Sequence, residues 1–289
     1  MNKHMEKPSY CIDIPADEYH QATKDNKFTS SHRLNLFRKC PALYIKHVTG
    51  EIVEGDTEAF LLGRATHTHV LEGQAKFYLE YTVASGPVNP KTGEPFGRMT
   101  KAYKDWAAAQ EKPIVNVEDF KTIAKMSEAV RGHLKALDIL RDGFAEATIR
   151  TKFGEEPVQV RLDWYDPERN IIADLKTCND VDRFAFDIRD FGYSHQLAFY
   201  AEAVRIARCA GTTKNPKYPA NLPECWIIAV EKREPFRVAV YQISQATLDD
   251  LIYSPVTKYG PGLYPTLAEL NNCRVTDTWP TRYENFGII

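Results

Sequence analysis

Two periodicities of hydrophobic residues divide the chain at about residue 145. Before that point, apolar positions recur at helical spacing. Ser30 and Ser31 can cap a short helix, which Pro41 interrupts or restarts. Residues 57–72 predict a mostly apolar helix closed by Gly73, because glycine tolerates the conformation that ends a helix. Asn116 can cap a long amphipathic helix, and its predicted apolar face carries Phe120, Ile123, Met126, Val130, Leu134 and Leu137.

After residue 145 apolar and polar positions alternate, as they do in strands. The segments EATIRTKF, VQVRLDW and IIADLKT predict three strands, and the turn-forming run DPERN joins the last two. A helix over residues 194–209 follows. The segments CWIIAVEK and FRVAVYQI predict two further strands, before a helical region from about residue 245 to residue 289. We therefore predict an α/β fold, with a mixed central sheet at about residues 145–245 flanked by helices and a helical N-terminal part at about residues 15–140.

Composition adds little about function. With 43% hydrophobic and 26% charged residues, the chain has the make-up of an ordinary globular protein. Its formal net charge of −2 does not point to nucleic acid, although binding needs only a local basic surface. A polar start and the lack of a long apolar run predict a cytoplasmic protein with no membrane span. The six cysteines are scattered, so we expect reduced thiols and no iron–sulfur cluster.

Two acidic residues fall on facing strands. In VQVRLD, alternation puts Asp163 on one face, and in IIADLK it puts Asp174 and Lys176 together. If the two strands form a hairpin about the DPERN turn, Asp163 lies nearly opposite Asp174, with Cβ atoms roughly 4.5–5.5 Å apart. Carboxylates that close repel each other unless one is protonated or a cation lies between them.

A divalent metal ion would relieve that repulsion. Mg²⁺ or Mn²⁺ prefers oxygen ligands, which Asp163, Asp174 and the backbone carbonyl of Leu175 can supply. Lys176 points the same way and could orient a water molecule or stabilise charge on a phosphate. An Asp-x-Lys tripeptide alone is frequent by chance, and a surface salt bridge explains most instances. The second aspartate upstream and the apolar run before Asp174 favour the metal site.

Two further pieces lie elsewhere in the chain. Gln196 and Tyr200 share one face of the helix after the strands, where both can hydrogen-bond to phosphate oxygens or to water. An amphipathic helix with incidental polar residues is the alternative. His67 lies in the apolar helix at residues 57–72, and such a histidine is more often a packed or surface residue. His69, two residues on, points away from it.

Together, these motifs resemble RecE (exonuclease VIII)-type nucleases, a branch of the PD-(D/E)xK superfamily that is related to lambda-type exonucleases and RecB-like nuclease domains. The resemblance runs in order over about two-thirds of the chain, from YH at residue 19 to residue 200. Its motifs are the helix capped by Ser30 and Ser31, CPALYIKHV, FLLGRATHTHVLEG, GRMTKAYKDW, LKALDILRDG, RLDW, IIADLKT and FGYSHQLAFYAEA. Leu162 stands where the superfamily's name has a proline, a position that varies.

The resemblance implies a role for each candidate. His67, Asp163 and Asp174 would be metal ligands, Lys176 the catalytic lysine, and Gln196 and Tyr200 the helix motif of this branch. Glu146 is a weaker candidate whose side chain could face the metal. The fold implied is a restriction-endonuclease-like core in a single nuclease domain over residues 1–289. RecE carries a long N-terminal region that these motifs do not match.

The implied activity is 5′→3′ degradation of one strand of linear double-stranded DNA in phage or prophage recombination. Its implied partners are double-stranded DNA ends, a RecT-type single-strand annealing protein and further copies of the chain in a ring. An endonuclease or repair nuclease of the same fold and an inactive DNA-binding scaffold remain as alternatives.

Basic residues in the N-terminal half could grip an entering duplex. They surround a Gly- and Pro-rich loop at residues 86–97, which should be exposed. A solvated helix face explains any single one of them equally well. The candidates are Arg33, Lys46, Arg64, Arg98, Lys101 and Lys104.

Overall fold

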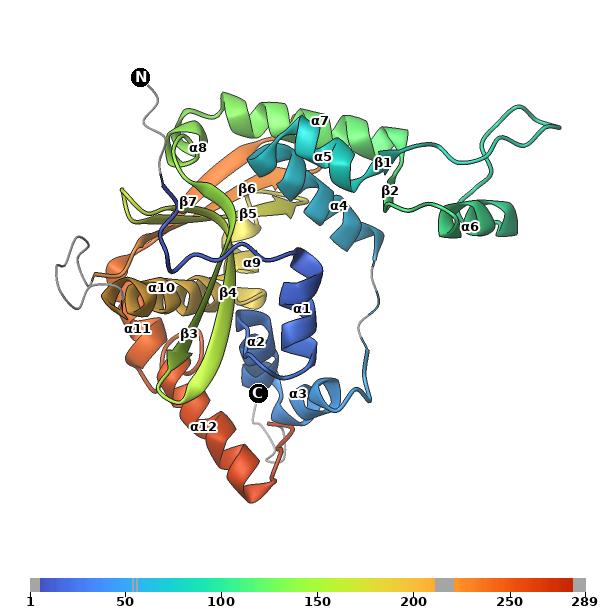
Figure 1. Ribbon diagram of the computed structural model, residues 1–289. Coiled ribbons are helices and arrows are strands. Elements are labelled where there is room, and N and C mark those ends of the chain that lie inside the picture. Colours follow the sequence, from blue (N-terminus) through green and yellow to red (C-terminus); the bar gives the residue numbers. More distant parts are fainter. Residues whose placement is uncertain (1–5, 54, 56, 211–220, 283–289) are drawn as a thin grey trace.

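A five-stranded mixed sheet forms the centre of the computed structural model, which describes residues 6–53, 55, 57–210 and 221–282 (Figure 1). The strand order is β3-β4-β5-β6-β7, and all neighbours are antiparallel except the parallel pair β5 and β6. The mixed α/β fold predicted from the sequence is therefore confirmed. The strands are β3 (Phe144–Phe153), β4 (Glu156–Asp166), β5 (Ile171–Cys178), β6 (Glu224–Glu231) and β7 (Val238–Ile243).

Helices cover both faces of this sheet (Figure 1). One face packs against α2 (Ser31–Lys39), α10 (Tyr193–Ala210), α11 (Gln245–Tyr253) and α12 (Leu263–Thr276). The other packs against α4 (Glu58–His67), the π-helix η1 (Thr68–Glu72), α5 (Gln74–Glu80), α7 (Val117–Gly132) and α8 (Leu134–Ile139). Further helices in the body of the molecule are α1 (Ala16–Lys24), α3 (Pro41–Val48) and α9 (Phe184–Asp190). No helix in the described part of the chain is long and apolar enough to cross a membrane.

Strand β5 is buried on both faces, which explains its nearly continuous apolar sequence. Ala173 and Leu175 contribute to the core beneath α4 and α7, whereas Ile172 and Cys178 face α10. Alternation therefore directs Asp174, like its even-numbered neighbours, toward α10. A charged residue at such a depth requires a partner or a function.

The helix starts agree with the sequence, and one prediction is wrong. The Ser30 hydroxyl accepts a hydrogen bond from the Arg33 N–H, and the Asn116 side chain caps α7 in the same way. The helix predicted at residues 57–72 is present and ends at Gly73, as α4 followed after His67 by the π-helix η1. The apolar face predicted to continue from α7 does not, because the extended backbone at His133 ends that helix, and Leu134 and Leu137 are exposed.

An arm formed by residues 84–113 projects from the body of the molecule (Figure 1). It leaves through the short parallel pair of β1 (Thr82–Val83) and β2 (Ile114–Val115) and carries helix α6 (Lys101–Ala108). The Gly- and Pro-rich loop predicted at residues 86–97 forms its outer part, with an isolated bridge between Val88 and Pro95. Within the arm, Gly86 lies against the Tyr103 ring, where a Cβ atom would approach to 2.7 Å.

Candidate catalytic centre

The site lies where β4 and β5 separate. Their ladder ends at the pair Trp164 and Ala173, so the next positions along the same register are Asp163 and Asp174. This is the opposition that the hairpin argument predicts. Beyond the fork, the Leu175 N–H donates a 2.8 Å hydrogen bond to Asp163 Oδ2 instead of to a backbone carbonyl of β4. Asp174 is 1% exposed, so its carboxylate lies inside the fold.

Glu146 occupies the position on β3 that faces Asp163. Its φ of 53° is left-handed, a conformation that costs a residue with a side chain roughly 1–3 kcal/mol. Ala145 and Ala147 on either side keep their partners on β4. Phe144 and Ala147 both contact the same core cluster, although they are three positions apart. The alternation of side chains between the two faces is therefore shifted by one position at this point of β3. The strained backbone turns the Glu146 carboxylate toward the fork.

Glu146, Asp163 and His67 could together hold a metal ion. One ligand atom from each lies within 4.8 Å of the others. The His67 Nδ1 atom is 3.5 Å from Asp163 Oδ2, although about a hundred residues separate the two in sequence. Arg161 forms an ion pair with Glu146 at 2.5 Å and donates a hydrogen bond to the Ile14 carbonyl, so the Glu146 carboxylate is held in place by a neighbouring positive charge.

Burial is the main electrostatic feature of this group. It lowers the pKa of His67, assisted by the charge of Lys176, so the imidazole is neutral near pH 7 and able to act as a ligand. A hydrogen bond between His67 and the Leu175 backbone opposes this effect and raises the pKa of His67. A bond of this kind favours the protonated ring, so the imidazole N–H is the donor and the Leu175 carbonyl is the acceptor. Burial also raises the pKa of Glu146, and the neighbouring Asp163 carboxylate raises it further.

Lys176 lies beside Asp174 on the same face of β5. Its Nζ atom is 2.5 Å from Asp174 Oδ2 and 4.9 Å from the centre of the Tyr193 ring. Burial alone would lower the pKa of Lys176, but the Asp174 and Asp163 carboxylates outweigh it and leave this pKa above its ordinary value. Burial, reinforced by Asp163 and opposed by Lys176, raises the pKa of Asp174 to about 6. Lys176 is therefore a stable positive charge beside a carboxylate that ionises below pH 7.

Gln196 and Tyr200 approach from α10. The Gln196 side-chain amide donates to Asp174 Oδ1 at 3.0 Å and lies 2.9 Å from the Tyr200 hydroxyl. The pair thus orients Asp174, and this contact is more specific than the phosphate or water contact anticipated from the sequence. Asp174 lies outside the group of three potential ligands, with Oδ1 held by Gln196 and Oδ2 facing Lys176.

A hard divalent cation fits these residues. Carboxylate oxygens and a neutral imidazole are suitable ligands, and a cation would offset the burial and the mutual repulsion that raise the pKa values of Glu146 and Asp174. The structure brings together His67, Glu146 and Asp163, and Asp174 lies near enough for the Asp163 carboxylate to raise its pKa. Glu146 was underestimated from the sequence because alternation along a regular strand does not reveal a left-handed residue.

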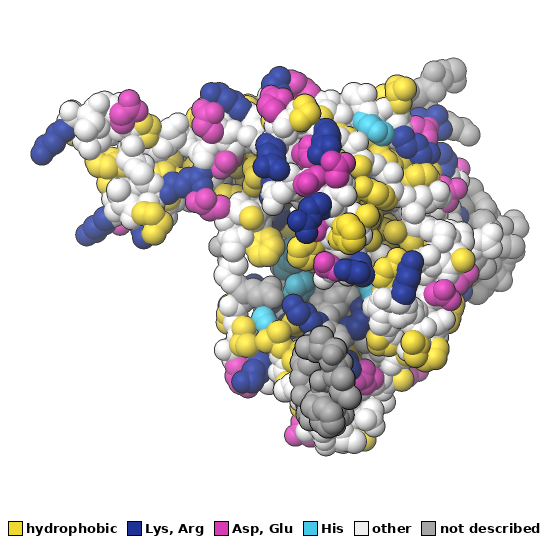
Figure 2. Space-filling model, turned by 180° about the vertical axis from the view of Figure 1, so that it is seen from behind, with side chains coloured by type: hydrophobic (Ala, Val, Ile, Leu, Met, Phe, Trp, Pro, Cys, Tyr) yellow, Lys and Arg dark blue, Asp and Glu magenta, His cyan; other side chains and the backbone are white. Residues whose placement is uncertain are grey.

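The six basic candidates do not form one cluster. Arg33 and Lys46 lie on α2 and α3, Arg64 on α4, and the others on the arm. Arg98 forms ion pairs with Glu58 at 2.6 Å and Asp119 at 2.9 Å, so it ties the arm to α4 and α7. The two candidate lysines on the arm, Lys101 and Lys104, are exposed. Figure 2 shows Lys and Arg side chains along the arm and over the adjoining face, interspersed with hydrophobic ones.

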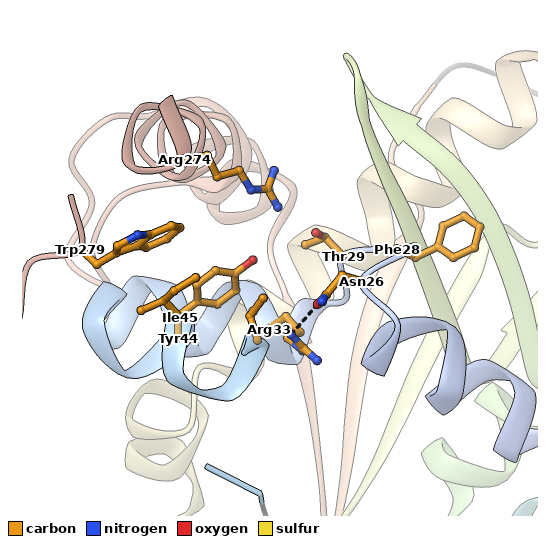
Figure 3. A pocket seen from close by; sticks show the side chains of 9 residues that line it. Asn26, Phe28, Thr29, Arg33, Tyr44, Ile45, Arg274 and Trp279 are labelled. Atoms are coloured by element: carbon orange, nitrogen blue, oxygen red, sulfur yellow. Dashed lines mark hydrogen bonds between the residues drawn. The ribbon is translucent and has the colours of Figure 1, made fainter. Parts of the chain in front are cut away.

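A cavity of about 230 Å³ lies apart from these carboxylates, between α2, α3 and α12 (Figure 3). Arg274 engages Glu156 through two contacts of 2.7 and 3.1 Å, and Arg33 donates to Asn26. Both guanidinium groups therefore have partners within the protein. None of the catalytic candidates lines this cavity, whose walls are Asn26, Phe28, Thr29, Arg33, Tyr44, Ile45, Val48, Arg274 and Trp279.

Comparisons with known proteins identify the family and the fold. Residues 30–286 match the family described as "PDDEXK-like domain of unknown function (DUF3799)". A crystal structure from Eubacterium rectale, described as that of a "Putative exonuclease", is similar to this chain with a TM-score of 0.62. The two chains are 13% identical, and the match covers 96% of each, so it supports the fold alone. No curated protein matches. The chain belongs to the PDDEXK-like family, and its core has the nuclease fold of that family.

Proposed function

We propose that this protein is a metal-dependent exodeoxyribonuclease that degrades one strand of linear double-stranded DNA in the 5′→3′ direction. The observation that carries the proposal is the strand fork, where Asp163 and Asp174 lie next to His67 and Lys176 inside a nuclease fold. A buried carboxylate beside a second, partly buried carboxylate and a partly buried lysine is costly for stability, which favours a catalytic reason for this arrangement.

His67, Glu146, Asp163 and Asp174 would hold Mg²⁺ or Mn²⁺, and the Leu175 carbonyl is a further candidate ligand. When bound, such an ion polarises phosphate oxygens and makes water more acidic. One imidazole among oxygen ligands suits Mn²⁺ better than Mg²⁺, so we expect activity with both and tighter binding of Mn²⁺. Arg161 would keep the Glu146 carboxylate in place while the ion exchanges.

Lys176 would act as a fixed cation. Because its pKa is raised, the ammonium stays protonated near pH 7 and cannot accept a proton from water. It would instead stabilise the negative charge that develops on the phosphate during cleavage, and would orient the attacking water through an N–H. Gln196 would hold Asp174 in the rotamer that faces the fork, with the Tyr200 hydroxyl behind it.

The direction of digestion and the partners rest on the resemblance to RecE-type nucleases. We propose that the substrate is a double-stranded DNA end, that the chain forms a homo-oligomeric ring, and that a RecT-type annealing protein receives the 3′ single strand. Recombination of phage or prophage DNA is the corresponding role. The substrate, the ring, the annealing partner and the role in recombination would distinguish the protein from an endonuclease or repair nuclease with the same centre, and from an inactive scaffold.

A cleavage assay with two labels tests the proposal. Linear duplex labelled at either 5′ or 3′ ends, and a closed circle of the same sequence, are incubated with Mg²⁺ or with EDTA. We expect Mg²⁺-dependent early release of the 5′ label, retention of the 3′ label, and an intact circle. Cutting of the circle would favour an endonuclease, and the lack of any cleavage would favour a scaffold.

A further inference from the structure

Two large aromatic side chains are exposed on the segment that joins the two halves of the candidate centre. Phe186 on α9 and Phe191 directly after it are 58% and 63% exposed. This segment follows β5, which carries Lys176, and precedes α10, which carries Gln196. Burying a phenylalanine ring stabilises a fold, so two exposed rings here forgo that contribution.

The Phe191 ring connects to Lys176 through one other ring. Phe191 lies 5.7 Å from the Tyr193 ring at an interplanar angle of 36°, and Lys176 Nζ lies over Tyr193 at 4.9 Å. On its other side Tyr193 stacks on Phe184 at 6.0 Å, and Phe184 is buried. Tyr193 is therefore fixed by the core, and Phe191 extends the aromatic surface from the candidate centre outward to solvent.

The backbone turn after Phe191 has a defined conformation. Gly192 has a φ of +71°, and its carbonyl accepts a 3.3 Å hydrogen bond from the Asn35 side chain on α2. A Cβ atom at residue 192 would lie 3.1 Å from Asn35 Nδ2, so the glycine allows this close contact. The position of Phe191 is thus set by packing against α2.

A hollow of about 280 Å³ lies along α9, and the exposed Phe186 is part of its lining. Arg189 and Lys258 contribute positive charge to it, while Phe186 and Tyr259 contribute rings. Lys258 Nζ lies 4.9 Å over the Tyr259 ring, and Arg189 pairs with the adjacent Asp190 at 2.9 Å. Proteins bind single nucleic acid strands with exposed aromatic rings and nearby cations, because the rings stack on bases and the cations attract phosphates.

We infer that Phe191, Tyr193 and the hollow beside α9 bind a single DNA strand and guide it to Lys176. A base stacks on the exposed Phe191 ring, and the phosphates that follow lie near Arg189 and Lys258. The strand must be unpaired, because a duplex hides the faces of its bases. The inference rests on the proposed nuclease function, which requires an unpaired strand at the metal-binding residues, and it names the residues that position that strand.

Binding of an oligonucleotide without cleavage tests this inference. A short single strand containing 2-aminopurine is titrated in EDTA with the wild-type protein and with Phe191→Ala. Loss of one base–aromatic stack should weaken binding about 5- to 150-fold and remove the fluorescence change that stacking produces. Phe191→Trp should restore both. Tyr253→Ala is the matched control, because Tyr253 is also about half exposed and stacks on a tyrosine, but at the end of α11.

Each outcome separates this inference from the proposed function. Stacking that depends on Phe191 in a protein that never cleaves DNA with Mg²⁺ would support the strand site and overturn the nuclease proposal. Cleavage of linear duplex with unchanged oligonucleotide binding by Phe191→Ala would overturn the strand site alone. A change in oligomeric state with Phe191→Ala, at unchanged oligonucleotide affinity, would overturn it in favour of an interface between protein chains.

Discussion

Replacing Lys176 with methionine should separate catalysis from metal binding. The change keeps the length of the side chain and removes a partly buried positive charge that lies 2.5 Å from Asp174 Oδ2. Because the raised pKa of Lys176 keeps it charged, the wild-type centre carries a fixed cation throughout the assay range. Loss of one preorganised electrostatic contributor typically lowers the rate about 10²–10³-fold, or about 2.7–4 kcal/mol of transition-state stabilisation.

At pH 8.5, the affinity of Lys176→Met for a metal ion should not fall together with its cleavage rate. Lys176 lowers the pKa of Asp174, so its removal moves that pKa above the value of about 6 and lets protons compete with a cation at neutral pH. At pH 8.5 protons compete far less for the carboxylate than at neutral pH, and the variant lacks a charge that repels a cation. We therefore expect equal or tighter Mn²⁺ binding at this pH.

Single-turnover cleavage of linear duplex and calorimetric titration with Mn²⁺ measure the two effects. Lys152→Met is the matched control, because Lys152 is exposed near the far end of β3 from Glu146. Circular dichroism establishes that each variant is folded. A cleavage rate within threefold of wild type, at roughly equal metal saturation, would refute the catalytic role of Lys176.

Three other changes give distinct outcomes. His67→Gln should weaken Mn²⁺ binding at least about 10-fold by calorimetry, whereas His69→Gln, whose ring faces Phe77, should not. Reversing Lys101 and Lys104 to glutamate should weaken binding of any duplex and flatten its salt dependence by about one unit per lost contact; an unchanged slope would remove the arm from the DNA path. Burial lowers the pKa of His195 to about 3, so the native state binds fewer protons than the unfolded state and stability falls as pH drops below 6.5. Between pH 7 and 4.5, urea unfolding should show wild type losing about 2.7 kcal/mol more than His195→Gln, and equal losses would contradict this.

The register that sets Asp163 against Asp174 could be predicted because it follows from local sequence, whereas the separation of β4 and β5 at these residues could not. A turn at DPERN fixes which residues of β4 and β5 face each other, and the two aspartates then fall opposite one another without further information. Helix starts were predictable for a similar reason, since Ser30 and Asn116 bond to backbone groups three residues away.

Other features depend on contacts that no local pattern records. His67 reaches Asp163 only through the packing of α4 on the sheet, and the family resemblance, not periodicity, pointed to it. The left-handed backbone of Glu146 is stabilised by its surroundings against an intrinsic preference for the extended form. The turn of π-helix after His67 likewise adds a residue within a sequence that fits an α-helix.

Anomalous diffraction from crystals grown with Mn²⁺ tests the central claim most directly, because it locates the ion without reference to activity. We predict a peak bounded by His67 and by the carboxylates of Glu146, Asp163 and Asp174, and its loss in crystals of Asp163→Asn. A peak at another site under conditions that support cleavage, or the lack of one at the fork, would contradict the assignment of the catalytic centre.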